Sequence, residues 1–330
     1  MNDLIFRKGN ENDLKNMCKL WNEEYDDNHF LKPMTLEEFV NKITSYEDFN
    51  WDTTLVVEKA GEFVGYSIYY DNKSYYDNPN YGAVLSVLLV KKAYRNNGIG
   101  SMLVKKVEEY FKNRGKKEVH VKYYLPACFS WYIPNTDKHD HPCAPGIRVN
   151  SPEYLYFSHR GYDPFVFQDA FHANLSEYHL PQEIETIIEK NAENGITIEV
   201  YDSKKHYGIE EFYEKLNIDA FNSVIKSNLE LEKPYPFLVV AKDNKIMGWT
   251  GAMWNEESGR GHFDGIAILE EVRGNGVGKA LFASLANYNK MNGAKFMTFY
   301  TGLNNFARFI YKGAGFKIVQ SFCFMKKVLK

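Results

Sequence analysis

Two segments of this chain show the same order of apolar and polar positions. In each segment, an apolar run is followed by a polar turn and then by a second apolar run that contains a glycine. The first segment, VVEKAGEFVGY, covers Val56–Tyr66 and turns at Ala60–Gly61, and the second, VVAKDNKIMGW, covers Val239–Trp249 and turns at Asp243–Asn244. Short apolar runs joined by such turn residues predict a β-hairpin in each segment.

The agreement continues downstream of both hairpins. An apolar strand is predicted over Ala83–Val90 in the first half and over His262–Leu269 in the second, and a glycine-containing loop and a helix follow each strand. Apolar residues recur at i, i+4 and i+7 in both helices, which is the spacing of a helix with one buried face. These residues are Leu103, Val107 and Tyr110 in the first helix and Leu281, Leu285 and Tyr288 in the second.

Each half then ends in the same way. A further strand is predicted over Glu118–Tyr124 and over Lys295–Thr301. A short helix that closes on an aromatic residue after a glycine follows over Glu153–Tyr162 and over Ala307–Phe316. One α/β domain is therefore used twice along the chain.

We expect the two domains to meet near residue 175, with an N-terminal domain over residues 1–175 and a C-terminal domain over residues 176–330. A chain of 330 residues is long enough for two hydrophobic cores. The first half contains an inserted loop, residues 126–149, whose prolines predict an ordered loop, with a substrate lid as an alternative. A metal site is a further alternative, but no second ligand pair follows His139, His141 and Cys143, so we expect no metal.

The composition excludes several classes of function. The formal net charge of −3 offers no concentrated basic surface for nucleic acid, and the longest apolar runs are too short to cross a membrane. Four scattered cysteines without a CxxC pair are typical of free thiols in a reducing compartment. The first residues lack the basic flank and apolar run of a signal peptide. We therefore expect a cytoplasmic protein without nucleic-acid or membrane partners.

The loops between strand and helix contain the most specific motif. They read RNNGIG from Arg95 and RGNGVG from Arg273. Backbone amides at the start of a helix bind phosphate, and glycine allows the phosphate to come close. Neither of two common phosphate-binding patterns fits: Ala280 stands where a Walker A loop requires Ser or Thr, and Leu103 and Leu281 stand where the Rossmann pattern requires its third glycine.

The pattern R-x-x-G-x-G directly after a strand resembles the coenzyme A pyrophosphate loop of the GNAT acetyltransferase superfamily. It occurs twice, each time between the same hairpin and the same helix, so the resemblance covers nearly the whole chain as two GNAT domains in tandem. The resemblance implies an α/β fold in which each domain is a mostly antiparallel mixed sheet flanked by helices. It also implies acetyl-CoA as the acyl donor, with its pantetheine arm along the strand before the loop.

The resemblance further implies which residues contact the cofactor. In the second half, the backbone of the strand end holds the arm, the loop holds the pyrophosphate, and an asparagine begins the closing motif; these positions are Ile268, Glu270, Arg273, Gly274, Asn275, Gly276, Val277, Gly278, Lys279 and Asn304. The first half offers matching positions at Val90, Arg95, Asn96, Asn97, Gly98, Ile99, Gly100 and Ser101.

The halves differ at the residue expected to protonate the departing sulfur. The family's closing motif, N-x-x-A-x-x-[hydrophobic]-Y, is complete from Asn304 to Tyr311, which implies that Tyr311 is the general acid. The first half has Phe157 at the matching position, and phenylalanine cannot donate a proton. Tyr156 is adjacent, but one residue along a helix points about 100° away.

A second difference lies in the strand before the loop. His262 and Asp264 are two positions apart, so both side chains project from one face of the predicted strand. Because family members often keep their general base here, both are catalytic candidates; the alternatives are a hydrogen-bonded core histidine and a turn or cap carboxylate. The matching residues in the first half are Val84 and Ser86, and neither is a plausible base.

These features favour an acetyl-CoA-dependent N-acetyltransferase that acts on a small-molecule amine by direct transfer in a ternary complex. We expect catalysis in the C-terminal domain, a catalytically degenerate N-terminal domain, and a monomer whose domains pair within the chain. Three alternatives stay open: a non-catalytic acyl-CoA sensor, a protein or peptide N-acetyltransferase, and an enzyme whose first half is active, with Ser86 or loop residues in place of the missing groups.

Overall fold

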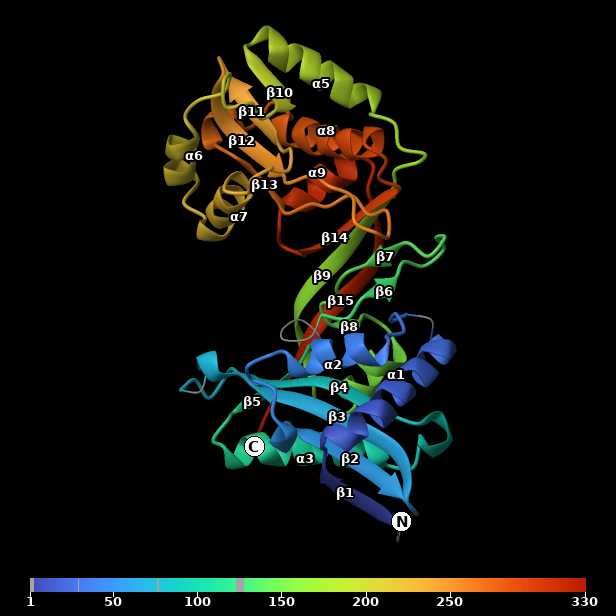
Figure 1. Cartoon of the computed structure of the whole chain (residues 1–330). Coiled ribbons are helices and arrows are strands. Elements are labelled where there is room, and N and C mark those ends of the chain that lie inside the picture. The colour runs from blue at the N-terminus through green and yellow to red at the C-terminus, as the bar shows by residue number, and fades with distance from the viewer. Residues whose placement is uncertain (1–2, 29, 76, 123–127) are drawn as a thin grey trace. The chain divides into compact units, whose positions relative to one another are not determined.

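The computed structural model describes residues 3–28, 30–75, 77–122 and 128–330 (Figure 1). The chain forms two compact units: unit 1 contains Met1–Gln168 and Ser321–Lys330, and unit 2 contains Asp169–Gln320. Residues 123–127 lie outside the described residues, and they include the end of the strand expected over Glu118–Tyr124 and the first two positions of the expected inserted loop.

Unit 1 is a mixed sheet with helices on both faces (Figure 1). Its helices are α1 (Leu14–Asn28), α2 (Leu36–Thr44), α3 (Ile99–Asn113) and α4 (Pro152–Ser158). Its strands are β1 (Leu4–Lys8), β2 (Thr54–Lys59), β3 (Glu62–Asp71), β4 (Ala83–Val90), β5 (Glu118–Val121), β6 (Trp131–Tyr132), β7 (Asp140–His141) and β8 (Ile147–Arg148), with the first part of β9 (Asp163–Asn174) and the last part of β15 (Lys317–Val328).

Alternation along β3 explains the two layers of helices. Tyr66 and Tyr70 pack with α1 and α2 on one face, whereas Tyr69 packs with α3 on the other. Successive side chains of a strand point to opposite faces, so one strand serves both cores. The predicted β2–β3 hairpin is present, and its turn residues Ala60 and Gly61 both have positive φ.

The pairing of β4 with β5 is short. β4 is antiparallel to β3 along its whole length, but its parallel pairing with β5 involves only Val84 and Leu85. β4 then continues to Val90, whereas β5 ends at Val121. β4 and β5 therefore separate in the middle of β4, and the part of β4 that is not paired with β5 leads to the first glycine loop.

The last strand of the chain completes the sheet of unit 1. β15 pairs antiparallel with β5, with Met325 opposite Val121, and with β8, with Phe322 opposite Arg148. The observed division therefore differs from the one expected near residue 175. The hydrogen bonds of β15 place Ser321–Lys330 in unit 1. The middle of β9 marks the other point at which the units divide.

Unit 2 also consists of β-strands and packed helices, in a similar order along the chain. Its helices are α5 (Gln182–Glu193), α6 (Ile209–Leu216), α7 (Asp219–Leu229), α8 (Val277–Met291) and α9 (Ala307–Gly313). Its strands are β10 (Ile196–Val200), β11 (Leu238–Lys242), β12 (Lys245–Gly251), β13 (Gly265–Ile268) and β14 (Phe296–Gly302), with the remaining parts of β9 and β15. β10 to β13 form an antiparallel sheet, and β14 pairs with β9. Both units therefore have the fold class that the sequence predicts.

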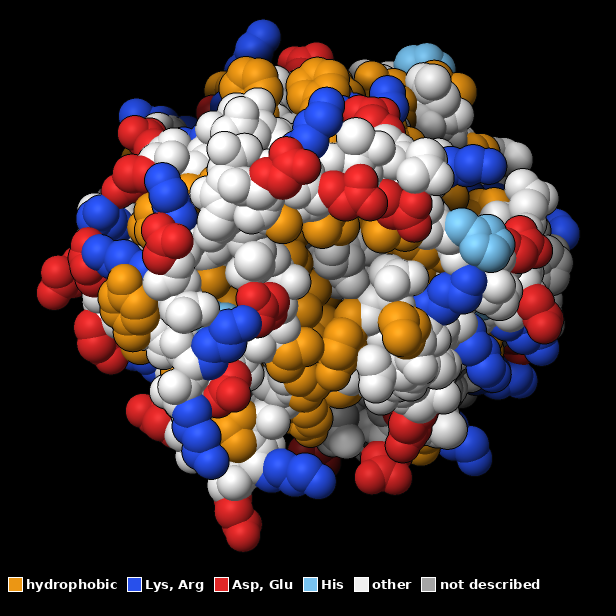
Figure 2. All heavy atoms as spheres, turned by 90° about the horizontal axis from the view of Figure 1, so that it is seen from above, with side chains coloured by type: hydrophobic (Ala, Val, Ile, Leu, Met, Phe, Trp, Pro, Cys, Tyr) orange, Lys and Arg blue, Asp and Glu red, His pale blue; other side chains and the backbone are white. Residues whose placement is uncertain are grey.

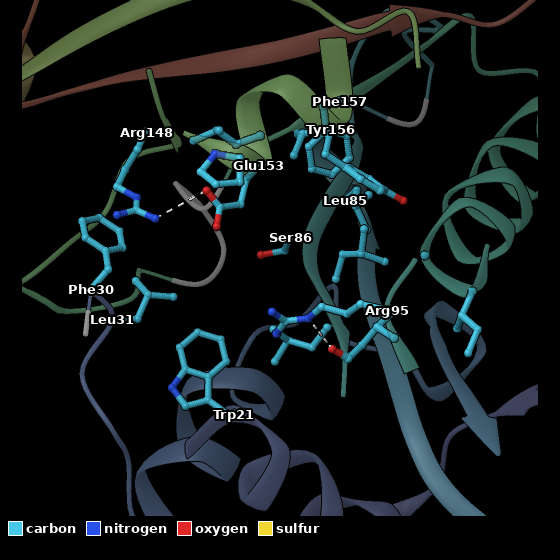
Figure 3. A pocket seen from close by; sticks show the side chains of 18 of the residues that line it. Trp21, Phe30, Leu31, Leu85, Ser86, Arg95, Arg148, Glu153, Tyr156 and Phe157 are labelled. Carbon is cyan, nitrogen blue, oxygen red and sulfur yellow. Dashed lines mark hydrogen bonds and ion pairs between the residues drawn. The ribbon is translucent and has the colours of Figure 1, made fainter. Parts of the chain in front are cut away.

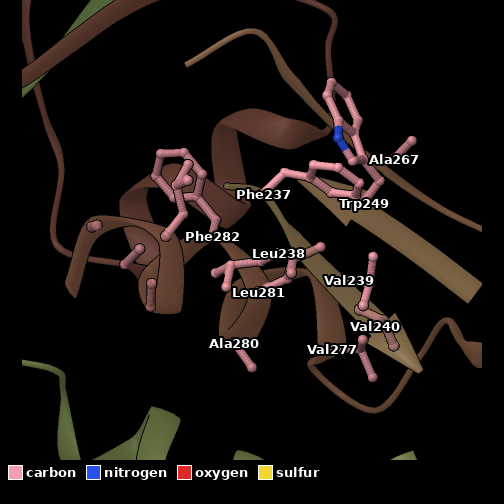
Figure 4. Packing of buried hydrophobic residues seen from close by; sticks show 14 of the residues in the cluster. Phe237, Leu238, Val239, Val240, Trp249, Ala267, Val277, Ala280, Leu281 and Phe282 are labelled. Atoms are coloured by element: carbon pink, nitrogen blue, oxygen red, sulfur yellow. The ribbon is translucent and has the colours of Figure 1, made fainter. Parts of the chain in front are cut away.

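The core of unit 2 lies between α8 and this sheet (Figure 4). Val277 and Leu281 on the buried face of α8 belong to the same cluster as Leu238 and Val240 of β11. Burial of this apolar face, predicted from its helical spacing, holds the helix against the strands. The start of α8, and with it the second glycine loop, is thereby held against the sheet.

The strand predicted over His262–Leu269 is shorter than expected. β13 covers only Gly265–Ile268, because the residues before it bond to loop backbone instead of continuing the ladder. The His262 amide donates to the Trp254 carbonyl over 2.9 Å. His262 therefore lies in a connecting segment and not in the strand.

The described part of the inserted segment is packed and ordered by short strands. β6 and β7 pair with each other, and the fully buried Trp131 stacks on Phe30 with ring centroids 5.2 Å apart. Trp131 also stacks on His141, whose Nδ1 accepts from the Cys143 amide. Among the residues that the structure describes, no group of three or more His, Cys, Asp or Glu side chains could hold a metal ion.

Charged side chains of both signs are interspersed on the face shown in Figure 2, where apolar side chains gather in a central hollow. This mixture accords with the formal net charge of −3. In the described parts of the chain, no helix is both long enough and apolar enough to span a membrane.

The contribution of β15 to unit 1 can be measured by truncating one buried side chain. Met325 is 0% exposed and Val328, on the same strand, is 58% exposed. Met325→Ala should lower the free energy of unfolding by about 2–5 kcal/mol, because it leaves a cavity in the core. Val328→Ala, the matched control, should have little effect. Urea unfolding of the full chain measures both, and equal effects would show that β15 is not part of the core of unit 1.

Candidate active site

Both glycine loops begin a helix in the same way. Gly98 and Gly276 are left-handed, with φ of 78° and 71°, and directly precede α3 and α8. The Met102 amide donates to the Gly98 carbonyl and the Ala280 amide to the Gly276 carbonyl, each over 3.0 Å. Amides before these donors have no partner inside the helix and lie at its positive end, which is where an anion binds.

One arginine in each loop ties the loop to the preceding strand. Arg95 Nε donates to the Val90 carbonyl, and Arg273 Nε donates to the Ile268 carbonyl, both over 3.0 Å. The repeat seen in the sequence therefore extends to side-chain geometry. In both units the amides at the start of the helix are held beside the end of a strand.

The short helices α4 and α9, which end the two repeats, contact the two loops differently. A Cβ built at Gly100 would lie 2.9 Å from the Tyr156 hydroxyl, whereas a Cβ built at Gly278 would lie 2.9 Å from the Ile310 side chain. A larger residue at either position would require the neighbouring side chain to shift. The first loop therefore has a polar hydroxyl beside it, and the second has an apolar side chain.

Helix α5 packs against the second glycine loop. The Ile187 side chain would lie 2.9 Å from a Cβ built at Gly276, and Asn191 Nδ2 donates to the Asn275 carbonyl over 3.1 Å. Lys279 Nζ lies 3.6 Å from a Glu183 carboxylate oxygen.

The other cofactor positions expected in unit 2 lie in varied surroundings. Gly274 has a φ of 97°, Val277 is buried, and Glu270 is exposed. Asn304 is exposed in a turn. Its neighbour Asn305 accepts at Oδ1 from the Ala307 amide, the first amide of α9, over 3.0 Å.

A cavity of about 460 Å³ opens in unit 1 beside the first loop (Figure 3). Leu88–Val90 line it where β4 runs past its pairing with β5, together with Arg95, Asn96 and Gly100 of the loop. Backbone groups of a strand edge must find partners, and a bound molecule can supply them here. The volume falls in the range of small-molecule sites.

The far end of the same cavity is aromatic and charged. It is lined by Trp21 of α1, by Phe30 and Leu31 that follow α1, by Arg148 of β8 and by Glu153 of α4. The Arg148 guanidinium lies 4.3 Å from the Phe30 ring centroid and 3.4 Å from Glu153 Oε2. Figure 3 shows Arg148, Glu153 and Phe30 across the cavity from Arg95, and Trp21 along its lower side.

Ser86 lies between the two ends. Its side chain is 1% exposed, and its Oγ has no hydrogen-bond partner among the described residues. Figure 3 shows the hydroxyl pointing into the cavity. An unpaired buried hydroxyl costs about 1–3 kcal/mol, so a ligand that bonds to Ser86 would offset that cost.

Tyr156 and Phe157 both line this cavity, although they are consecutive on α4. Burial raises the pKa of the Tyr156 hydroxyl, with Arg160 and Ser101 acting in the opposite direction. Tyr156 therefore keeps its proton at neutral pH and can donate it. Phe157 is buried against Tyr162 and has no proton to give.

In unit 2, the two residues expected to act as bases contact each other. His262 Nε2 lies 2.7 Å from Asp264 Oδ1, and His262 Nδ1 lies 3.3 Å from Glu256 Oε1. The imidazole is stacked on Trp254 with ring centroids 3.4 Å apart. The other Asp264 oxygen accepts from the Ala252 amide over 3.0 Å. Both imidazole nitrogens are thus engaged by carboxylates.

Opposite charges stabilise the network of His262, Asp264 and Glu256. Burial alone would lower the pKa of His262, but the bonds to Asp264 and Glu256 outweigh it, so the pKa is raised. Burial would raise the pKa of Glu256, but bonds from His262 and Arg260 outweigh it, so that pKa is lowered. The histidine is therefore stabilised as a cation between two carboxylates.

Tyr311 lies in an aromatic cluster of unit 2. Its ring centroid is 5.5 Å from that of Phe171, 4.7 Å from that of Phe282 and 4.5 Å from that of Phe299. Burial raises its pKa to about 12, so the hydroxyl keeps its proton at neutral pH. Phe263 joins the same cluster. His262 and Asp264, on either side of Phe263, bond to each other instead.

The far end of the unit 1 cavity contains residues that the sequence did not single out. Trp21, Phe30, Arg148 and Glu153 come from four separate segments without common spacing. Glu153 was visible only as the start of a predicted helix. The one available signal was the length of the inserted segment, since long insertions often carry function.

The His262 network predicts pH-dependent stability. A histidine whose pKa is higher in the folded chain contributes stability that is complete below its unfolded pKa of about 6.5 and is lost as the pH rises through the higher folded pKa. His262→Gln should therefore lower the unfolding temperature more at pH 6 than at pH 9. Calorimetric scans at both pH values measure this. His179→Gln, an exposed histidine of the same unit, is the control; an effect of His262→Gln independent of pH would contradict the raised pKa.

Comparison with known proteins adds the family. The sequence profile described as the Acetyltransferase (GNAT) family matches residues 14–128 and 198–316. No curated protein matched the sequence.

Similar solved structures extend over the whole chain. One is a fungal multi-domain GH3 β-N-acetylglucosaminidase with a GCN5-related glucosamine N-acetyltransferase region, with a TM-score of 0.64, 14% identity, and 98% of this chain but 38% of that chain covered. Another is a GCN5-related N-acetyltransferase from Sphaerobacter thermophilus, with a TM-score of 0.59, 17% identity, and 100% and 97% covered. A third is a tandem GNAT protein from the clavulanic acid biosynthesis pathway, with a TM-score of 0.57, 14% identity, and 99% of each chain covered.

At these identities the structures show the fold alone, and this chain spans less than half the length of the fungal one. The family profile goes further, because its two matches lie one in each unit and together cover more than half of the sequence. This chain therefore belongs to the GNAT acetyltransferase family, with two GNAT domains in tandem.

Proposed function

We propose that this protein is an acetyl-CoA-dependent N-acetyltransferase that transfers the acetyl group directly to a small-molecule amine, and that transfer takes place in the cavity of unit 1. The observation that carries the proposal is that one cavity joins the anion-binding loop at Arg95 to the charged, aromatic end at Glu153. A ternary complex needs such a space, because donor and acceptor must be held together in a reactive geometry.

The first loop and the end of β4 would hold the cofactor. The amides from Asn96 to Ser101 suit a pyrophosphate, and the edge of β4 near Val90 suits an extended arm. Gly100 fits this role, since a side chain there would collide with Tyr156 at the mouth of the loop. When bound, acetyl-CoA supplies a thioester whose carbonyl carbon an amine can attack.

Glu153 would take the proton from the amine. It is the only carboxylate among the described residues that line the cavity, and Figure 3 shows it directed into the open space. Ser86 and Tyr156 supply hydroxyl donors for the negative charge that develops on oxygen and then on sulfur. These groups would compensate for the hydroxyl that Phe157 lacks.

The lining also favours direct transfer over a covalent acyl-enzyme. A covalent route needs a nucleophile with an adjacent base to activate it. Neither histidine nor cysteine occurs among the described residues that line the cavity. Attack by the amine itself is therefore the simpler route.

Catalysis in unit 2, on Tyr311, Asp264 and His262, is the second candidate. Tyr311 supports it, because its raised pKa keeps the hydroxyl protonated. Two observations weigh against it. Both ring nitrogens of His262 already face carboxylates, and Ile310 packs closely against the loop at Gly278.

Charge reversal at the two matched arginines separates these locations. Arg95→Glu should weaken acetyl-CoA binding about tenfold or more, because it places a carboxylate beside the phosphates. Arg273→Glu, the matched control, should leave binding in unit 1 unchanged. Isothermal titration of the full chain measures both variants.

The opposite pattern, with binding lost only in Arg273→Glu, would move the cofactor to unit 2. Two sites in the wild type, one lost in each variant, would mean that both loops hold acetyl-CoA. If the wild type did not bind acetyl-CoA at all, the proposed function would be wrong.

Removal of the proton acceptor should slow the reaction without preventing cofactor binding. Glu153→Gln should lower kcat/KM for an amine acceptor by about 10²-fold or more at neutral pH, and by less at high pH, where the amine is already deprotonated. Thiol release from acetyl-CoA measures the rate. Tyr311→Phe should leave the rate nearly unchanged; a large loss in this variant, with Glu153→Gln active, would instead favour catalysis in unit 2.

A further inference from the structure

The cavity of unit 1 has two ends of different character, and the far end is where an acceptor would bind. This step rests on the proposed function, which assigns the Arg95 end to the cofactor. Ser86 lies between that end and the group formed by Arg148, Glu153 and Phe30 (Figure 3). The chemistry of the far end therefore describes the acceptor.

Two opposite charges face this space and are only loosely bonded to each other. Arg148 Nη2 and Glu153 Oε2 are 3.4 Å apart, at the limit of a hydrogen bond. The other guanidinium nitrogens of Arg148 and the other Glu153 oxygen have no hydrogen-bond partner among the described residues. The Arg148 side chain is largely buried, and its face rests on the Phe30 ring. Its remaining donors are thus available to a ligand anion.

A simple amine would satisfy only half of this arrangement. Its nitrogen could bond to Glu153, but it would leave the Arg148 guanidinium without an anion in a partly dehydrated site, which is unfavourable. A carboxylate in the acceptor would bond to Arg148, which presents paired donors suited to a planar carboxylate. An amine and a carboxylate on one carbon match the adjacent positions of Glu153 and Arg148.

The remaining wall of the far end is apolar. Trp21, Phe30 and Leu31 supply it, and the Trp21 indole N–H is already bonded to the Lys32 carbonyl over 3.1 Å. Only the apolar surface of the ring is left for a ligand. Amino sugars would place several hydroxyls against this wall without partners, and polyamines would bring more cations than Glu153 can balance.

We infer that the acceptor is a free α-amino acid with an apolar side chain, whose carboxylate is held by Arg148 and whose amine faces Glu153. In the reaction, the ammonium first gives one proton to Glu153, which releases it to water. The amine nitrogen then bonds to the acetyl carbon, the carbon–sulfur bond breaks, and the second nitrogen proton passes to the departing thiolate. The amino terminus of a peptide lacks the α-carboxylate, so Arg148 also disfavours peptide acceptors.

The inference is tested with pairs of acceptors that differ only in the carboxylate. L-Phenylalanine is compared with 2-phenylethylamine, and L-leucine with 3-methylbutylamine, by thiol release from acetyl-CoA with the full-length protein. The amino acid should have at least about a tenfold higher kcat/KM in each pair, since a charged hydrogen bond of this kind is lost in its partner.

Substitution of Arg148 then tests the residue. Arg148→Gln should raise the KM of the amino acid, bring the ratio within each pair close to one, and leave the decarboxylated amine unaffected. Arg114→Gln is the matched control, since Arg114 is a half-exposed arginine of the same unit that pairs with Asp71 away from the cavity. It should leave the ratio unchanged.

The outcomes separate this inference from the proposed function. Equal rates within each pair, or a ratio that survives Arg148→Gln, would overturn the amino-acid assignment while the N-acetyltransferase function stands. Acetyl-CoA binding without turnover of either amino acid would overturn the assignment as well. Failure to bind acetyl-CoA in the calorimetric titration, by contrast, would remove the proposed function itself.

Discussion

The divergence of β4 from β5 after Leu85 is the constraint on which the rest of the site depends. Two paired strands satisfy each other's backbone groups, so no ligand can enter between them. After β5 ends, the backbone groups on that edge of β4, as far as Val90, are available to a ligand. Arg95 bonds to the Val90 carbonyl and so holds the first glycine loop next to that edge. The cavity, its two ends and Ser86 are all arranged around this short unpaired stretch.

The repeated loop does not make the two units equivalent. Both loops have the same left-handed glycine and the same arginine contact, yet their surroundings are set by residues elsewhere. In unit 1 the closing helix places Tyr156 beside Gly100, and in unit 2 it places Ile310 beside Gly278. The sequence favoured Tyr311, in the second half, as the general acid, whereas the structure shows an open cavity in the first half.

The far end of the cavity also depends on the last strand of the chain. Arg148 lies on β8, which pairs with β15 at Phe322, and Phe322 in turn packs against Phe30 with ring centroids 5.9 Å apart. The side chains at the far end are therefore supported by a strand more than a hundred residues away in sequence.

The sequence by itself determined the hairpins, the helices α3 and α8, both glycine loops and the family, because each depends on local spacing or on turn residues. It predicted one strand as too long, since the backbone before Gly265 bonds to a loop. Only the tertiary structure decided that His262 is held between two carboxylates, and that Arg148 and Glu153 meet at one cavity. The partners in each grouping are near one another in sequence, but most of them lie in loops and at the ends of elements, where spacing does not predict side-chain direction. The fold of these segments therefore decides which side chains meet.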